Sequence, residues 1–101
     1  MKWPKQLDMI SKSFTVRNKG GLHARPSGAL SRYFIERALT AQIEYNNHMV
    51  DSDSTLDILS LCVPENKDVM IILDRTHATV AESIFDDLAV LFAHAFYMDK
   101  P

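Results

Sequence analysis

Cysteine and glycine are scarce in this chain, with one cysteine and three glycines among 101 residues. A single thiol, that of Cys62, cannot form a disulfide within the chain, and such sparing use of cysteine is typical of a reducing compartment. The apolar run at residues 88–93 is far too short to cross a bilayer. The N-terminal residues lack the apolar stretch of a signal peptide. We therefore expect a cytoplasmic protein without membrane insertion.

Charge of one sign is not in excess, because 11 lysines and arginines face 13 aspartates and glutamates, for a net charge of -2. Proteins that bind nucleic acid through its phosphates usually carry a clear positive excess, so we expect no nucleic acid partner. Hydrophobic residues make up 47% of the chain and charged residues 24%, the composition of a folded domain. The length fits one domain.

Side chains that bind metal ions are poorly grouped. The four histidines are His23, His48, His77 and His94. They lack the close spacing of zinc ligands, and we expect three of the four to be ordinary surface or loop residues. Asp51, Asp53 and Asp57 begin like a calcium loop, but Leu56 stands where that loop requires glycine. We therefore expect no metal site and no cofactor.

Hydrophobic periodicity predicts the element order βαββαβα. Alternating apolar residues indicate strands, and apolar residues at steps of three and four indicate helices. The predicted strands are 13–17, 41–45, 48–52 and 69–73, and the predicted helices are 24–38, 54–61 and 80–95. Short runs joined partly by hairpins favour the α+β class, with a four-stranded antiparallel sheet and three helices on one face. Residues 1–12 would be an N-terminal extension to a domain of residues 13–101.

The later helices carry capping patterns and core residues. Ser54 with Asp57, and Thr79 with Glu82, have the spacing of capping boxes. Cys62 follows the apolar second helix, so we expect its thiol to pack in the core. The same is expected of three aromatic residues on or beside the apolar stripe of the last helix: Phe85, Phe92 and Phe96.

The segment from Gly21 to Pro26 has the character of an anion site. His23 follows two glycines and precedes a predicted helix, whose first N–H groups lack intrahelical partners and form a positive end. Arg25 adds a guanidinium that binds phosphate oxygens in pairs. The positive end favours the neutral imidazole, which is the nucleophilic form. Together these properties suit reversible transfer of a phosphoryl group to His23, with Arg25 neutralising its charge.

A plainer interpretation is that His23 only caps the predicted helix of an interaction domain. In that case His23→Ala would change the stability slightly and phosphorylation not at all. The spacing of the segment leaves both interpretations open.

The contiguous run Gly21-Leu22-His23-Ala24-Arg25-Pro26 resembles the active-site signature of the HPr family, the histidine phosphocarriers of the sugar phosphotransferase system. The resemblance extends over residues 13–97 and implies an open-faced β-sandwich. It also implies that His23 receives phosphate on Nδ1 from Enzyme I, which phosphoenolpyruvate charges, and passes it to IIA domains with the help of Arg25. Such a protein carries phosphate and is not an enzyme with a substrate pocket. We expect it to act as a monomer.

The same resemblance places Ser54 at the regulatory serine that many HPr proteins carry, the target of HPr kinase/phosphorylase. Ser54 also caps the predicted second helix, whose dipole favours a phosphate. Three nearby carboxylates, those of Asp51, Asp53 and Asp57, oppose a phosphate there through like-charge repulsion.

The expected docking surface for Enzyme I and the IIA domains lies on the first two helices and the loop before them. Its expected residues are Leu22, Pro26, Arg32, Leu56 and Leu59. One surface serves donor and acceptor in turn, so binding is expected to be weak and transient. The alternative is a regulatory HPr-like protein, whose phosphorylation at His23 or Ser54 controls a kinase, transcription factor or enzyme rather than sugar uptake.

Overall fold

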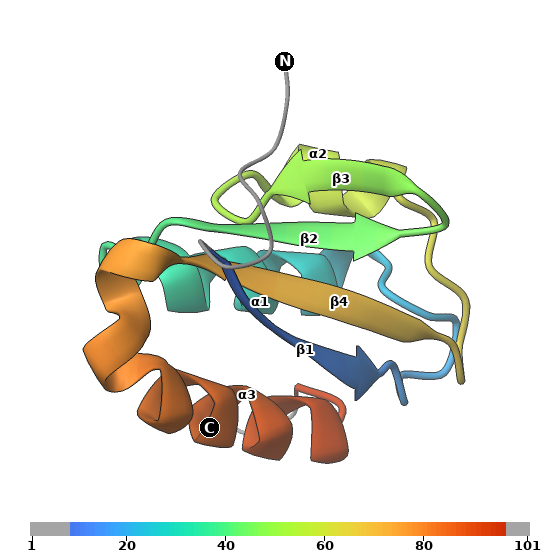
Figure 1. Cartoon of the computed structure of the whole chain (residues 1–101). Coiled ribbons are helices and arrows are strands. Elements are labelled where there is room, and N and C mark those ends of the chain that lie inside the picture. The colour runs from blue at the N-terminus through green and yellow to red at the C-terminus, as the bar shows by residue number, and fades with distance from the viewer. Residues whose placement is uncertain (1–8, 97–101) are drawn as a thin grey trace.

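Four strands form one antiparallel sheet in the structure, a computed structural model that describes residues 9–96 (Figure 1). The strands are β1 (Met9–Thr15), β2 (Ala41–Tyr45), β3 (His48–Asp51) and β4 (Asp68–Asp74). Their order across the sheet is β1-β4-β2-β3. The last strand in the chain, β4, therefore lies inside the sheet and pairs with both β1 and β2.

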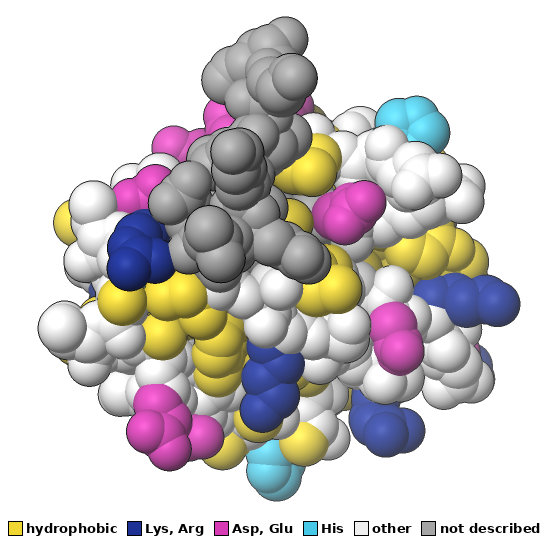
Figure 2. All heavy atoms as spheres, in the orientation of Figure 1, with side chains coloured by type: hydrophobic (Ala, Val, Ile, Leu, Met, Phe, Trp, Pro, Cys, Tyr) yellow, Lys and Arg dark blue, Asp and Glu magenta, His cyan; other side chains and the backbone are white. Residues whose placement is uncertain are grey.

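Three α-helices cover one face of this sheet and leave the other face open, which confirms the predicted α+β class and element order. The helices are α1 (Ala24–Glu36), α2 (Thr55–Ser60) and α3 (Ala81–Ala93), and a 3-10 segment, η2 (Arg75–Val80), precedes α3. Figure 1 looks onto the open face, with α1 partly hidden behind β4 and β2. On this open side acidic and basic side chains are interspersed (Figure 2).

The hydrophobic core lies between the sheet and the helices. Alternate residues of β4, Val69, Ile71 and Leu73, are buried in it, as the period of two in a strand requires. From α1, Leu30 and Phe34 meet them, and neither has any exposed surface. The spacing of four between these two residues places them on one face of the helix, which holds α1 against the sheet.

Aromatic rings join β1 to α3 within the same core. Phe14 of β1 stacks on Phe92 of α3 with ring centroids 5.0 Å apart. Phe92 meets Phe96 edge-on at 4.9 Å, and Phe85 lies 6.1 Å from Phe14. The prediction that Phe85, Phe92 and Phe96 belong to the core is confirmed.

Several predicted boundaries differ from the structure, among them the start of the first strand and the end of the first helix. The first strand begins at Met9 and not at residue 13, with Lys12 opposite Ile71 of β4. Residues 9–12 therefore belong to the sheet, whereas residues 1–8 of the predicted extension lie outside the described part of the chain. The first helix ends at Glu36, before the predicted residue 38, because Ala38 adopts a positive φ of 53° that no α-helix continues.

The predicted capping box of Thr79 and Glu82 is wrong. The N-cap of α3 is Val80, and it makes no side-chain capping bond, because η2 already leads the chain into the helix. Capping occurs instead at the start of η2, where the carboxylate of Asp74 accepts hydrogen bonds from the hydroxyl and the backbone N–H of Thr76. These hydrogen bonds lower the pKa of Asp74.

The prediction that Cys62 packs in the core is also wrong, because its thiol is exposed. Cys62 adopts a positive φ of 52° just after α2 and turns the chain there. Its neighbours Leu61 and Val63 take the buried positions, at 8% and 2% exposure. The tight turn thus places two core residues inward and the residue between them outward.

Candidate functional site

The loop before α1 begins with a turn that requires glycine. The N–H of Gly21 donates to the carbonyl of Asn18 at 2.8 Å, and Gly20 and Gly21 have φ angles of 86° and 79°. A Cβ on Gly21 would lie 2.0 Å from the carbonyl oxygen of Val63. No side chain fits at such a distance, so Gly21 lets the loop lie directly on the chain after α2.

Further hydrogen bonds fix the backbone between this turn and the helix. The N–H of Leu22 donates to the carbonyl of Val63 at 2.9 Å, and the hydroxyl of Ser27 donates to the carbonyl of Leu22 at 2.9 Å. The N–H of His23 donates to the carbonyl of Gly21 at 2.9 Å. With Leu22 buried at 2% exposure, the loop is held from both sides, and it presents His23 in one backbone conformation.

His23 stands at the N-cap position of α1 with an exposed side chain. Its carbonyl accepts the first helical hydrogen bond, from the N–H of Ser27 at 3.0 Å, but its imidazole makes no capping bond. The ring lies beside the turn, since a Cβ on Gly20 would be 3.5 Å from its Cδ2 atom. The side chain of His23 therefore does not cap the helix, unlike in the plainer interpretation of the sequence.

The first turn of α1 concentrates positive potential near this imidazole. Residue 26 is proline and has no N–H, so the N–H groups at the start of the helix are those of Ala24 and Arg25. Helix geometry directs them out of the N-terminal end of the helix. The first turn contains no acidic residue to offset them. The exposed guanidinium of Arg25 stands in the same turn. The arrangement suits an anion with several oxygens, such as a phosphoryl group on the imidazole.

The predicted docking residues fall into two groups. Leu22 and Pro26 are buried, so their prediction as contacts is wrong; Leu22 belongs to the core cluster, and both support the loop from beneath. Arg32 on α1 is exposed, and Leu56 on α2 is 76% exposed. Leu59 is half-buried beside it.

Ser54 lies at the N-cap of α2, as predicted. Its side-chain oxygen accepts a hydrogen bond from the N–H of Asp57 at 3.2 Å. The residue is half-buried, and the neighbouring Asp53 and Asp57 are exposed. The hydroxyl thus holds the start of α2 from a position that solvent partly reaches.

A polar contact joins α1 to α2. The hydroxyls of Ser31 and Thr55 lie 2.7 Å apart, and the methyl group of Thr55 is 4.0 Å from the position of a Cβ on Gly28. The small residues of α1 therefore let α2 approach closely, which brings the exposed faces of the two helices into one surface.

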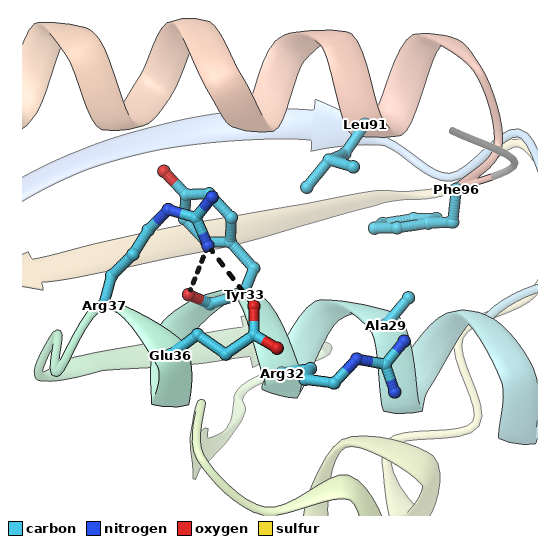
Figure 3. Close-up of a pocket in the computed structure, with 7 residues that line it drawn as sticks. All are labelled: Ala29, Arg32, Tyr33, Glu36, Arg37, Leu91 and Phe96. Carbon is cyan, nitrogen blue, oxygen red and sulfur yellow. Dashed lines mark hydrogen bonds and ion pairs between the residues drawn. The ribbon is translucent and has the colours of Figure 1, made fainter. Parts of the chain in front are cut away.

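A groove of about 250 Å³ lies between α1 and α3, and sequence reasoning did not find it (Figure 3). On the α1 side, the hydroxyl of Tyr33 donates to Asp87 of α3 at 2.8 Å, and the guanidinium of Arg37 lies 4.0 Å from the centre of the Tyr33 ring. Residues 33 and 87 lie 54 positions apart, so no local pattern signals the contact. The groove is built by the packing of two helices and is separate from the helix start that carries His23.

The Tyr33 phenol makes stability depend on pH in the alkaline range. Burial, followed by the hydrogen bond and negative charge of Asp87, raises the pKa of Tyr33. Because the folded state holds this proton more tightly than the unfolded chain does, stability is lost as the pH rises above about 10, the ordinary pKa of tyrosine.

We expect Tyr33→Phe to lower the stability by about 1 kcal/mol at neutral pH, because the hydrogen bond to Asp87 is lost. The variant should also lose less stability than the wild type as the pH becomes alkaline. Urea unfolding of both proteins at neutral and alkaline pH measures the difference. If both proteins lose the same stability between neutral and alkaline pH, the alkaline loss does not come from Tyr33.

Within residues 9–96, no three metal-ligating side chains come together. In the same described part, no helix has the length and apolar character needed to span a bilayer.

Comparison with known proteins gives a family and several relatives. Residues 10–93 match the family described as PTS HPr component phosphorylation site. The phosphocarrier protein HPr of Chlamydia muridarum is 28% identical over 87 residues, which cover 86% of this chain and 81% of that protein. The phosphocarrier protein HPr of Chlamydia trachomatis is 32% identical over 62 residues, 61% of this chain, and the match spans only 57% of that relative.

Solved structures share the fold. A phosphocarrier protein HPr from Bacillus anthracis matches with a TM-score of 0.71 and 25% identity, over 83% of this chain and 96% of that one. HPr-C-His from Thermoanaerobacter tengcongensis matches with a TM-score of 0.70 and 22% identity, over 90% of this chain and 99% of that one. Since the family match runs from β1 to the end of α3, this chain belongs to the HPr family of phosphotransferase-system phosphocarriers.

Proposed function

We propose that the chain carries a phosphoryl group on His23, taking it from Enzyme I, which phosphoenolpyruvate charges, and passing it to IIA domains. The observation that carries the proposal is the position of His23, whose imidazole is exposed at the positive start of α1 and makes no capping bond. We place this transfer in the cytoplasm. The protein serves as an intermediate in it and not as an enzyme that turns over a small substrate.

The chemical step needs a neutral imidazole and an anion-binding surface. The lone pair of one ring nitrogen, Nδ1 by the family resemblance, attacks the phosphorus while the other nitrogen holds the ring proton. A P–N bond forms, the bond from phosphorus to the donor breaks, and its electron pair stays with the donor. The helix start and Arg25 stabilise the charge on the phosphoryl oxygens in both directions of transfer.

We expect Arg25→Ala to slow phosphorylation of His23 about tenfold, because one charge-assisted contact to the phosphoryl oxygens is lost. The phosphorylation rate of Arg25→Lys should lie between those of Arg25→Ala and the wild type, since lysine keeps the charge but loses the paired geometry of the guanidinium. Rapid-quench measurement with limiting Enzyme I gives the rates. Lys12→Ala, which removes an exposed cation from β1, serves as the control and should match the wild type. Equal rates for all four proteins would remove Arg25 from the mechanism.

The whole proposal is tested by phosphorylation with phosphoenolpyruvate and purified Enzyme I from the same source, followed by addition of a IIA domain. Intact mass and ³¹P NMR detect the phosphohistidine, which is labile in acid. Transfer onward to the IIA domain supports carriage. A chain that takes no phosphate from this Enzyme I contradicts the proposal.

The second candidate is the regulatory function, and the position of Ser54 favours it. Its partly exposed hydroxyl begins α2, the helix that also bears the exposed Leu56, so a phosphate there would alter the same surface. Incubation with ATP and HPr kinase/phosphorylase tests it. An acid-stable phosphate that Ser54→Ala abolishes, together with a lasting complex with a regulator, supports this function. Unmodified protein contradicts it.

A further inference from the structure

We infer that the surface formed by α1 and α2 is electrically polarised and fits an Enzyme I that sets acidic groups against α1 and a basic group against the outer side of α2. This inference rests on the proposed function and names the chemistry of its partner. It is built from three features of the surface: a basic row, an apolar strip and an acidic edge.

The basic row lies on α1 and consists of Arg25 and Arg32. Seven residues separate them, which is about two helical turns, so they lie on one side of the helix. Both are exposed. Within residues 9–96, Arg32 forms no hydrogen bond or ion pair, and its charge is available to a partner.

The apolar strip lies beside the contact between Ser31 of α1 and Thr55 of α2, since Ile35 stands about one helical turn after Ser31. Its most exposed members are Ile35 of α1 and Leu56 of α2, at 55% and 76% exposure. These are the two most exposed large hydrophobic side chains in the described part of the chain. Because Thr55 faces α1 through Ser31, the helical step of about 100° places Leu59 and then Leu56 progressively further from α1.

The acidic edge lies beyond Leu56. The same helical step places Asp57 further around α2, on the side away from α1, and Asp53 stands in the turn before the helix. Both are exposed, and their carboxylates have no hydrogen bond or ion pair with other residues of the segment 9–96. The surface therefore runs from the exposed arginines of α1, across isoleucine and leucine, to the exposed carboxylates of Asp53 and Asp57.

Such a pattern favours one kind of partner and disfavours another. An apolar centre supplies affinity, and charges on either side set the orientation and the association rate. A partner with a uniformly acidic contact surface would meet repulsion at Asp57. An Enzyme I with opposite charges on the two sides would be attracted in the orientation that brings its donor to His23.

The test is the second-order rate of phosphoryl transfer from Enzyme I of the same source, charged by phosphoenolpyruvate, to wild type and to Asp57→Lys. We expect the variant to be about tenfold slower at low salt and the difference to shrink as salt is added. The transfer rate of Asp57→Asn should lie between those of the wild type and Asp57→Lys. Asp86→Lys makes the same charge change on an exposed residue of α3 and should match the wild type.

Asp57→Lys keeps the N–H that bonds to Ser54, so the capping of α2 is retained, and thermal unfolding of each variant checks the fold. A variant that transfers as fast as the wild type, or faster, overturns the inference and leaves the proposed function standing. Failure of the wild type to accept phosphate overturns both. An equal loss in Asp57→Lys and Asp86→Lys also overturns it, because the effect would then come from net charge alone.

Discussion

Replacing His23 with alanine is expected to abolish phosphorylation by phosphoenolpyruvate and Enzyme I while leaving the fold intact. The imidazole supplies the only bond to the phosphoryl group in the proposed step, and nothing in alanine replaces it. Stability should change by less than about 0.5 kcal/mol, because the His23 ring is exposed and makes no capping bond. Intact mass after incubation, with urea unfolding alongside, measures both effects.

The matched control is His94→Ala. His94 is also exposed, at the C-terminal end of α3, and no part of the proposed mechanism uses it. This variant should gain the same phosphate as the wild type. If His23→Ala still gains an acid-labile phosphate, the phosphoryl acceptor is another residue and the mechanism is wrong.

The second large effect is expected from Gly21→Ala. Its Cβ would stand 2.0 Å from the carbonyl oxygen of Val63, at a φ of 79° that alanine already disfavours. The loop must then leave Val63, which also breaks the hydrogen bond from Leu22. We expect a loss of about 3–5 kcal/mol in stability and a greatly slowed transfer to His23. Urea unfolding and the phosphorylation rate measure the two consequences.

Gly20→Ala separates the steric cause from the conformational one. Gly20 has a similar φ of 86°, but its Cβ would meet only Cδ2 of His23, at 3.5 Å, an ordinary contact distance. The expected loss is about 1 kcal/mol, from the positive φ alone. Similar losses in the two variants would mean that the contact with Val63 contributes nothing.

The sequence predicts much of this fold because its signals are local. The spacing of Leu30 and Phe34 gives α1, and the β-branched run around Ile71 gives β4. The start of β1 escapes prediction because Ser11, Lys12 and Ser13 carry no apolar alternation. As an edge strand, β1 takes its register from pairing with β4, and such pairing is invisible in the strand's own residues.

The features of the site also divide into those that local residue types predict and those that depend on tertiary packing. The exposed His23 at a helix start follows from local residue types, and so does the cap at Ser54. The burial of Leu22 depends on Val63, which lies far along the chain, and the exposure of Cys62 depends on a backbone angle that few residues other than glycine adopt. The contact between Tyr33 and Asp87 needs two helices packed side by side, so only the tertiary structure reveals it.

The strand order also has a consequence for synthesis on the ribosome. Both β1 and β2 pair with β4, which ends at Asp74, so a nascent chain that stops before residue 68 can form only the β2–β3 hairpin. An isolated two-stranded hairpin is at best marginally stable. The glycine turn and His23 are made before β4, yet the sheet that supports them closes only after β4 has left the exit tunnel. Folding of this domain therefore waits for β4 to emerge, and a product truncated before β4 leaves the histidine loop without its scaffold.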